Sequence, residues 1–304
     1  MSIIELRGLR KHYGTFHAVD GLDLTVEPGD IYGFLGPNGA GKSTSIRMMM
    51  SLIRPTGGSI RIFGQSIETH REAILRRIGA IVERPDFYNY LTARHNLELL
   101  GRMSGADVSR ANLLRVLGIV GLDHRADSKV KTFSHGMKQR LGIAQALLHD
   151  PDLIVLDEPT TGLDPQGMKD IRDLILSLRS EHRKTIFLSS HILPEVELTA
   201  NRMIVINRGK AVVEGAVQDL LNAGRLKVTI ATPQANEAAV LLRQSHADAN
   251  LQVADGAIVM MAERADIAHI VSHLTQSGIS VESVVPVRSL EEYFLSLTSE
   301  AADA

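Results

Sequence analysis

Cysteine and tryptophan are absent from the 304 residues, and aromatic residues make up only 4% of them. Without cysteine the chain can form no disulfide, thiolate zinc site, iron–sulfur cluster or cysteine nucleophile, and a reducing, cytoplasmic setting fits this composition best. The scarcity of aromatic rings argues against the stacking platforms that bind single-stranded nucleic acid. Disulfide chemistry and cysteine catalysis are therefore excluded at the outset.

An excess of positive charge is also missing. The chain has 33 basic and 35 acidic residues and a formal net charge of -2, so it lacks the electropositive surplus that binding to phosphate backbones requires. We expect no nucleic acid among its partners. When glycine is not counted as apolar, the longest apolar run is Ala257–Ala262, which is far shorter than the roughly 20 residues of a membrane-spanning helix. The first residues, Met-Ser-Ile-Ile-Glu, do not follow the order of a signal peptide.

Short apolar strands alternate with helix-length segments through the first two thirds of the chain. This alternation predicts an α/β domain with a largely parallel sheet covered by helices. The predicted strands are residues 22–27, 31–35, 59–63, 78–82, 153–156, 184–189 and 203–206. The predicted helices are residues 43–53, 69–76, 92–104, 108–117 and 136–149.

The composition changes near Gly224, where charged helices give way to alanine-rich segments. This change predicts two domains, residues 1–222 and residues 226–304. The expected elements of the second are a strand at 226–231, a helix at 236–246, one strand or a hairpin at 250–262, a helix at 265–277, a strand at 279–287 and a helix at 289–298. Their order predicts a small α+β fold of ferredoxin-like type. The sequence assigns this second domain no role.

A glycine-rich loop joins the predicted strand 31–35 to the predicted helix 43–53. Its sequence, Gly36-Pro37-Asn38-Gly39-Ala40-Gly41-Lys42-Ser43-Thr44, has the phosphate-loop spacing, in which backbone N–H groups and the helix N-terminus converge on phosphate oxygens. Lys42 would face the β/γ-phosphates, and the Ser43 hydroxyl is a ligand suited to Mg²⁺. The loop therefore predicts binding of a nucleoside triphosphate with Mg²⁺.

Two adjacent acids, Asp157 and Glu158, end the apolar strand 153–156. Ligands of parallel sheets bind at the carboxyl ends of their strands, and strand alternation directs the two carboxylates differently. Asp157 could hold Mg²⁺, and Glu158 could act as the general base for an attacking water. Such a pair can also simply cap a helix, but the phosphate loop favours the catalytic interpretation.

Together these segments resemble an ABC-type ATPase, specifically the nucleotide-binding subunit of a bacterial exporter, over residues 2 to about 222. The segment Phe133-Ser134-His135-Gly136-Met137 resembles the family signature and, like it, opens a helix. The resemblance implies that Ser134 and Gly136 contact the γ-phosphate of ATP held by a partner's phosphate loop. A single chain carries one copy of each motif, so the resemblance implies a head-to-tail dimer with two ATP molecules, most simply a homodimer.

Three further positions acquire roles from the same resemblance. Tyr13 matches the aromatic residue that stacks on adenine, His191 matches a histidine that contacts the γ-phosphate, and Asp164 belongs to the aspartate loop of the dimer interface. Each has a simpler alternative: a buried tyrosine, a structural histidine, and a cap on the helix that starts near Pro165.

Two positions depart from the usual family pattern. Glu83 stands where many members carry glutamine, and its carboxylate could still bind Mg²⁺. His135 stands in the signature where glycine is common, and its titratable ring predicts a pH-sensitive ATPase. Glu83 and the Ser-x-Gly-Met-Lys-Gln signature are similar to those of bacitracin and lantibiotic self-protection exporters, and the chain also resembles multidrug export ATPases.

Phe87, Tyr88 and Tyr90 cluster just after Glu83. Exposed rings are enriched at interfaces, and in the family this region receives a cytoplasmic helix of the membrane subunit. The three rings are therefore a candidate docking site, with packing inside the helical lobe as the alternative.

The resemblance implies an ATPase subunit that is bound to the cytoplasmic face of the membrane through a separate permease and that exports a drug, an antimicrobial peptide or a lipid-like molecule. The predicted catalytic residues are Lys42, Glu158 and His191. The alternative is a soluble ABC-type ATPase that acts on ribosomes, DNA or cluster assembly. A nucleotide sensor without turnover is less favoured, because every catalytic position is filled.

Overall fold

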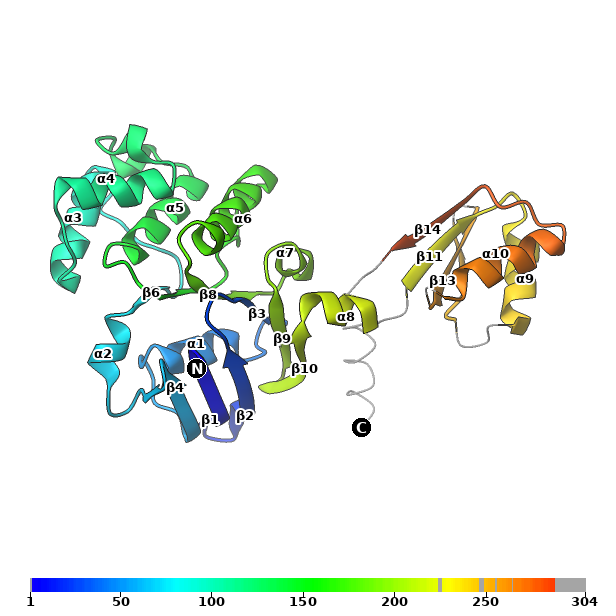
Figure 1. Ribbon diagram of the computed structural model, residues 1–304, viewed down its shortest axis with the longest axis horizontal. Coiled ribbons are helices and arrows are strands. Elements are labelled where there is room, and N and C mark those ends of the chain that lie inside the picture. Colours follow the sequence, from blue (N-terminus) through cyan, green and yellow to red (C-terminus); the bar gives the residue numbers. More distant parts are fainter. Residues whose placement is uncertain (1, 224–225, 246–248, 255, 264, 288–304) are drawn as a thin grey trace. The chain divides into compact units, whose positions relative to one another are not determined.

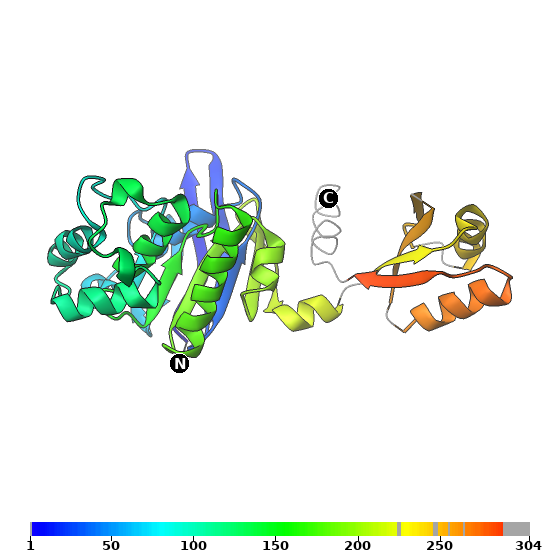
Figure 2. The same ribbon diagram turned by 90° about the horizontal axis from the view of Figure 1, so that it is seen from above.

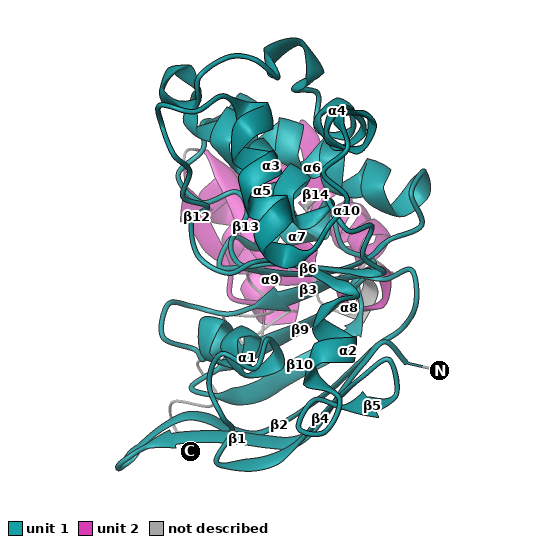
Figure 3. Cartoon of the chain, turned by 90° about the vertical axis from the view of Figure 1, so that its left-hand side faces the viewer, with its two compact units in different colours: residues 1–217 teal, residues 218–304 magenta. Residues whose placement is uncertain are grey.

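The computed structural model describes residues 2–223, 226–245, 249–254, 256–263 and 265–287. The chain forms two compact units, Met1–Val217 and Gln218–Ala304, which Figure 3 colours separately. The helix predicted at 289–298 lies outside the described residues.

A six-stranded sheet in the order β10-β9-β3-β8-β7-β6 lies at the centre of the first unit. Its strands are β3 (Ile31–Leu35), β6 (Ile78–Ile81), β7 (Leu153–Leu156), β8 (Thr185–Ser190), β9 (Arg202–Asn207) and β10 (Lys210–Ala216). Neighbouring strands are parallel except for β9 and β10. The predicted α/β architecture is thus confirmed. Strand β10 was not predicted, because this half-exposed edge strand contains only a short run of apolar residues.

A second, antiparallel sheet in the order β2-β1-β4-β5 packs beneath the first. It consists of β1 (Ile4–Tyr13), β2 (Phe16–Val26), β4 (Gly57–Ile62) and β5 (Gln65–Ser66). Helix α1 (Lys42–Met49) lies between the two sheets (Figures 1 and 3). Met48, Met49 and Met50 join side chains of both sheets in one buried core. This core fixes the phosphate loop, which directly precedes α1.

The opposite face of the six-stranded sheet is covered by α5 (His135–Ala146), α6 (Pro165–Ser180) and α7 (Leu193–Glu197), as Figure 2 shows from above. Helices α3 (Ala93–Ser104) and α4 (Arg110–Ile119) pack with α5 into a helical lobe, and α2 (Arg71–Leu75) precedes β6. Among the described residues, no helix combines the length and the apolar character needed to cross a bilayer.

The second unit begins within α8 (Val217–Ala223) and contains a four-stranded antiparallel sheet in the order β12-β13-β11-β14. Its other elements are β11 (Leu226–Ala231), α9 (Ala235–Ser245), β12 (Gln252–Ala254), β13 (Ala257–Ala262), α10 (Ile267–Gln276) and β14 (Ser283–Val287). Alternate residues of β11 and β13 pack with both helices in one core. This strand order is compatible with the ferredoxin-like topology, which stays a prediction.

Candidate functional site

Four groups of predicted site residues follow four neighbouring parallel strands. In the sheet, β3, β8, β7 and β6 lie side by side, and their carboxyl ends lead into the phosphate loop, His191, the Asp157–Glu158 pair and Glu83, respectively. A backbone hydrogen bond from Asp157 to Ile81 (2.9 Å) and another from Gly36 to Ser190 (3.3 Å) tie these ends together. Residues far apart in the sequence therefore meet at one edge of the sheet.

The phosphate loop is held in shape by close backbone approach. Gly41 adopts φ +105°, and a Cβ atom there would lie 2.4 Å from the carbonyl oxygen of Ala18. Gly41 also caps α1 and has no side chain that could accept the N–H groups of the first turn. Those groups are available to an anion, as the sequence predicts for a phosphate.

Lys42 is buried, and its ammonium group contacts three oxygen atoms of the site. Nζ lies 2.7 Å from the Gly36 carbonyl oxygen and 3.2 Å from that of Pro37. It also lies 3.4 Å from Oε1 of Glu158. The positive charge is thus held between the loop that would bind phosphate and the carboxylate that would face it.

Glu158 joins the phosphate loop to His191. Its backbone adopts φ 50°, a left-handed conformation that is uncommon for this residue type. Its Oε2 lies 3.1 Å from Nδ1 of His191 and accepts a 2.9 Å hydrogen bond from Thr161. Burial raises the pKa of Glu158, but the Thr161 hydrogen bond and the charges of Lys42 and His191 outweigh it, so the net shift is downward. The carboxylate is therefore ionised at neutral pH.

Two hydroxyl groups that the sequence analysis did not single out organise the acid pair. Ser189 is fully buried, donates a 2.5 Å hydrogen bond to Oδ1 of Asp157 and accepts one of 2.9 Å from the backbone N–H of Glu158. The Thr161 hydroxyl donates a hydrogen bond to the side-chain carboxylate of Glu158. The sequence signal that could have identified Ser189 is the pair of serines, Ser189 and Ser190, at the end of an apolar strand.

The lowered pKa of Glu158 predicts an acid-dependent loss of stability. A carboxyl group whose pKa is lower in the folded state stabilises the fold at neutral pH, and this contribution disappears as the pH falls below the ordinary glutamate value of 4.5. Without nucleotide, the Tm difference between the wild type and Glu158→Gln should therefore shrink as the pH falls below that value. A constant difference, measured by circular dichroism, would contradict this account.

Glu83 contacts a group that the sequence did not predict. Its side chain is exposed and forms an ion pair with Arg47 on α1, and its backbone adopts φ 75°. The structure thus places Glu83 at the same sheet edge as Asp157, but its carboxylate is directed to a guanidinium group. A role in binding Mg²⁺ requires this ion pair to open.

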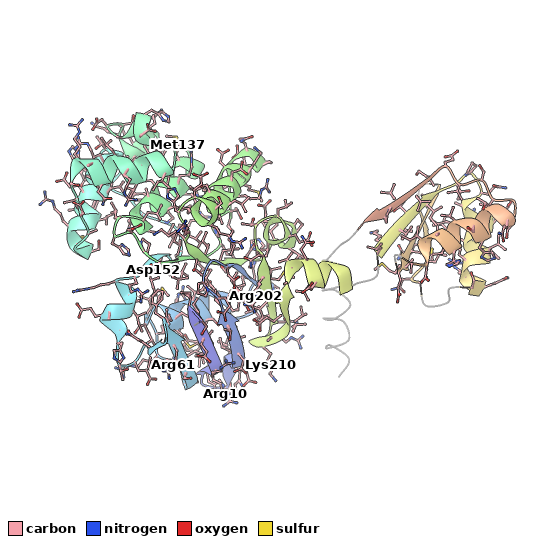
Figure 4. The ribbon with its side chains drawn as sticks, in the orientation of Figure 1. Arg10, Arg61, Met137, Asp152, Arg202 and Lys210 are labelled. Carbon is pink, nitrogen blue, oxygen red and sulfur yellow. The ribbon has the colours of Figure 1, made fainter. Side chains whose placement is uncertain are left out.

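The signature and the aspartate loop form one surface. Ser134 caps α5 through a 3.2 Å hydrogen bond from Met137 N–H, and Asp164 caps α6 through one of 3.0 Å from Gly167 N–H. The simpler expectation for Asp164, a helix cap, is thereby confirmed. Both caps, with Gly136, line an open cleft of about 410 Å³. Figure 4 labels Met137, which also lines it.

His135 links the two halves of this surface. Its Nδ1 lies 3.1 Å from the carbonyl oxygen of Gly162, which can only accept, so Nδ1 carries the hydrogen. Gly162 adopts φ +78°, and an added Cβ would lie 3.2 Å from the His135 ring. The ring thus connects the first residue of α5 to the loop that precedes α6.

Replacing His135 should change the pH dependence of ATP hydrolysis. His135→Gly removes both the titratable ring and the hydrogen bond to Gly162, whereas His135→Gln keeps a donor that does not titrate. We expect the pH profile of both variants to differ from that of the wild type, and the glutamine variant to keep more activity. Identical pH profiles for the wild type and His135→Gly would contradict this prediction.

The aromatic positions are only partly as expected. Tyr13 is 51% exposed, and the Lys11 ammonium lies 4.9 Å from its ring centre, so the alternative of a buried tyrosine is excluded. Tyr88 and Tyr90 are exposed and in edge contact, with 6.0 Å between ring centres. Phe87 is only 8% exposed. Including Phe87 in an exposed docking cluster was wrong, because its ring belongs to the core.

The chain is similar to known proteins over most of its length. The family model described as ABC transporter matches residues 19–161. The bacitracin transport ATP-binding protein BcrA of Bacillus licheniformis is 44% identical over 298 residues, which cover 97% of each chain. The daunorubicin/doxorubicin resistance ATP-binding protein DrrA of Streptomyces peucetius is 35% identical over 99% of this chain and 93% of the relative.

A solved structure shares the fold of the first unit. It is a dimeric ATP-binding cassette in a post-hydrolysis state with ADP and Pi. The match has a TM-score of 0.62 and 26% identity, and it covers 70% of this chain and 98% of the other.

Proposed function

The chain belongs to the ABC transporter family, and on this premise we propose that it is the ATP-hydrolysing subunit that powers the separate membrane permease of an exporter. The observation that carries the proposal is Glu158, whose two oxygens lie between Lys42 and His191 at the phosphate loop. Relatives that match nearly the whole chain are named for bacitracin transport and for daunorubicin/doxorubicin resistance. A drug, an antimicrobial peptide or a lipid-like molecule is accordingly the proposed cargo. These relatives do not favour a soluble ATPase acting on ribosomes, DNA or cluster assembly.

In the proposed site, residues 36–44 enclose the phosphates and Tyr13 stacks on the base. The Lys42 ammonium would exchange the carbonyl oxygens of Gly36 and Pro37 for phosphate oxygens. Glu158 would accept a proton from the water that attacks the γ-phosphate, and His191 would orient both. Lys42, His191 and Glu158 lie close together because they follow the adjacent strands β3, β8 and β7.

The residues that would hold Mg²⁺ fit its chemistry. Ser43 offers a hydroxyl and Asp157 a carboxylate whose Oδ1 is already oriented by Ser189, and Mg²⁺ prefers such oxygen ligands. Glu83 would join them only after release from Arg47. When bound, the ion would neutralise charge that develops on the phosphate oxygens.

We propose that two copies of the chain form a head-to-tail ATP sandwich. The cleft beside Ser134, Gly136 and Asp164 would receive the γ-phosphate held by the phosphate loop of the other copy. Residues 1–222 would form this ATP-binding domain, and residues 226–304 an accessory domain of ferredoxin-like type. The complex would lie at the cytoplasmic face of the membrane through its permease.

The proposal requires that a neighbouring reading frame in the genome encodes a multi-span membrane protein, and it is tested by co-expressing that protein with this chain. We expect the two to purify together in detergent, and ATP hydrolysis by the reconstituted pair to respond to candidate cargo. Co-purification with ribosomes or DNA, without any membrane subunit, would overturn the proposal in favour of the soluble alternative.

Alanine replacement of both Tyr88 and Tyr90 should uncouple the chain from its permease. Tyr90 is 68% exposed, so truncation costs little stability, while loss of two interface rings costs several-fold or more in affinity. We expect ATP hydrolysis by the isolated chain to stay within about twofold of wild type. Stimulation by reconstituted permease should be lost. The matched control is Phe16→Ala, because Phe16 is also exposed but lies on β2.

A further inference from the structure

Two histidines and an aspartate gather on the β1–β2 hairpin, apart from the acid pair and the phosphate loop. We call His12, His17 and Asp20 the hairpin triad. Their potential ligand atoms all lie within 4.8 Å of one another. The two imidazole rings stack with 3.9 Å between centres and 12° between planes. No motif of the nucleotide site uses these side chains.

An irregular register brings the triad onto one face. His12 pairs with His17, and Arg10 pairs with Asp20 across the two strands. In a regular strand, His17 and Asp20 would point to opposite faces, because they are three positions apart. A register shift between Lys11 and His12 leaves Ala18 as an extra residue in β2, and such a bulge re-aims the side chains that follow it. The geometry therefore depends on this specific irregularity.

The triad contains a nitrogen atom that lacks a partner. Within the described residues, Nε2 of His12 is buried and makes no hydrogen bond. The backbone N–H of His12 donates to Thr56 Oγ1, at 3.2 Å. A buried polar atom without a partner costs free energy, and a coordinated cation would supply the interaction.

The ion pairs that Asp20 makes with other described residues are loose. Its Oδ1 lies 3.7 Å from Nε of Arg10, and its Oδ2 lies 3.4 Å from Nζ of Lys210. Both cationic side chains, labelled in Figure 4, are more than half exposed. They can turn to solvent when the carboxylate binds a cation, although their charge lowers the affinity for it. The carboxylate is thus an accessible third ligand.

We propose that the hairpin triad binds one divalent transition-metal ion of the zinc type. Imidazole nitrogens with one carboxylate suit Zn²⁺ and its neighbours, whereas Mg²⁺ prefers a set of oxygen ligands. The exposed His17 can adjust its rotamer to bring both rings to the metal–nitrogen distance of about 2.0–2.1 Å. Because Tyr13 directly follows His12, a bound ion would also restrain the tyrosine proposed to stack on adenine.

The proposal is tested on the full chain, purified without a polyhistidine tag, stripped of metal by a chelator and free of nucleotide. Isothermal titration with Zn²⁺, and visible absorption with Co²⁺, should report one site. We expect His12→Ala and His17→Ala each to weaken binding at least tenfold. Zn²⁺ should raise the Tm of the wild type but not of either variant, because only the native site binds the ion.

Two variants serve as matched controls. His124→Ala removes an exposed histidine whose Nδ1 lies 3.8 Å from a carboxylate oxygen of Asp123, and the described residues offer it no third ligand. His191→Ala removes the nitrogen beside Glu158. Both should bind Zn²⁺ like the wild type. Loss of the ion only in His191→Ala would place it at the catalytic carboxylate and overturn the proposal.

Folding of the triad variants is checked independently. His17 is exposed, so His17→Gln should keep the metal-free Tm and the affinity for ATP while losing the Co²⁺ absorption. If His17→Gln and His12→Ala, both with a wild-type Tm, still bind Zn²⁺ with wild-type affinity, the hairpin triad is not a metal site. Failure of the proposed exporter function would leave this test unaffected, because its readouts require neither hydrolysis nor a permease.

Discussion

Replacing Glu158 by glutamine is expected to reduce steady-state ATP hydrolysis by about 100-fold or more, because general-base catalysis typically contributes a factor of this size. ATP binding should persist. Glutamine has nearly the same shape and can still contact Lys42, Thr161 and His191, but it cannot accept a proton from water. Measured turnover close to that of the wild type would show that Glu158 is not the base.

The electrostatics of the site give this expectation its physical basis. Without nucleotide, burial raises the pKa of Glu158, but the Thr161 hydrogen bond and the charges of Lys42 and His191 outweigh it and hold the pKa below its usual range. A bound triphosphate would attract the Lys42 ammonium group away from Glu158. It would also add negative charge near the Glu158 carboxylate. Both changes raise the pKa of a carboxyl group. Glu158 should therefore become a stronger base as the substrate binds.

The same variant tests the ATP sandwich. With hydrolysis blocked, Glu158→Gln saturated with ATP and Mg²⁺ should be dimeric by small-angle scattering, since the closed state no longer decays. A variant that stays monomeric under these conditions would contradict the head-to-tail arrangement. Glu181→Gln is the matched control, because Glu181 is an exposed glutamate at the end of α6. It should hydrolyse ATP like the wild type.

The sequence predicts the parts of the site that depend on local order. The phosphate loop and the Asp157–Glu158 pair each lie within a few residues at the end of an apolar strand, so their place in a parallel sheet follows from the pattern alone. Ser189 donates to Asp157 from a residue 32 positions away. That contact exists only because β8 lies between β3 and β7, an order that periodicity does not encode.

Half-exposed strands and local packing account for what the sequence analysis missed. β1 carries charged residues, and its pairing with β2 is interrupted by register shifts, so neither alternation nor an apolar run identifies it. Phe87 resembles its neighbours Tyr88 and Tyr90 in composition, but its ring is buried and theirs are exposed. Which of the three rings is buried depends on the conformation of the turn that follows β6, and no sequence pattern predicts that conformation.

Replacing Lys42 by alanine is expected to lower the affinity for ATP at least tenfold and to abolish measurable turnover. The ammonium group supplies the buried positive charge nearest the phosphate loop, with Nζ 2.7 Å from the Gly36 oxygen. A tenfold loss corresponds to about 1.4 kcal/mol, which is modest for a charge-assisted contact. Fluorescent nucleotide binding and phosphate release measure the two effects separately.

The loss should be specific to this lysine. Lys184 is also largely buried and pairs with a carboxylate, its Nζ lying 2.7 Å from Oδ1 of Asp150, but it precedes β8 at the amino ends of the strands. Lys184→Ala should therefore leave ATP affinity unchanged. Lys42→Arg keeps the charge but should not restore turnover, because a planar guanidinium is too large for a slot bounded by two carbonyl oxygens. Wild-type ATP affinity in Lys42→Ala would show that the loop binds phosphate through its backbone N–H groups alone.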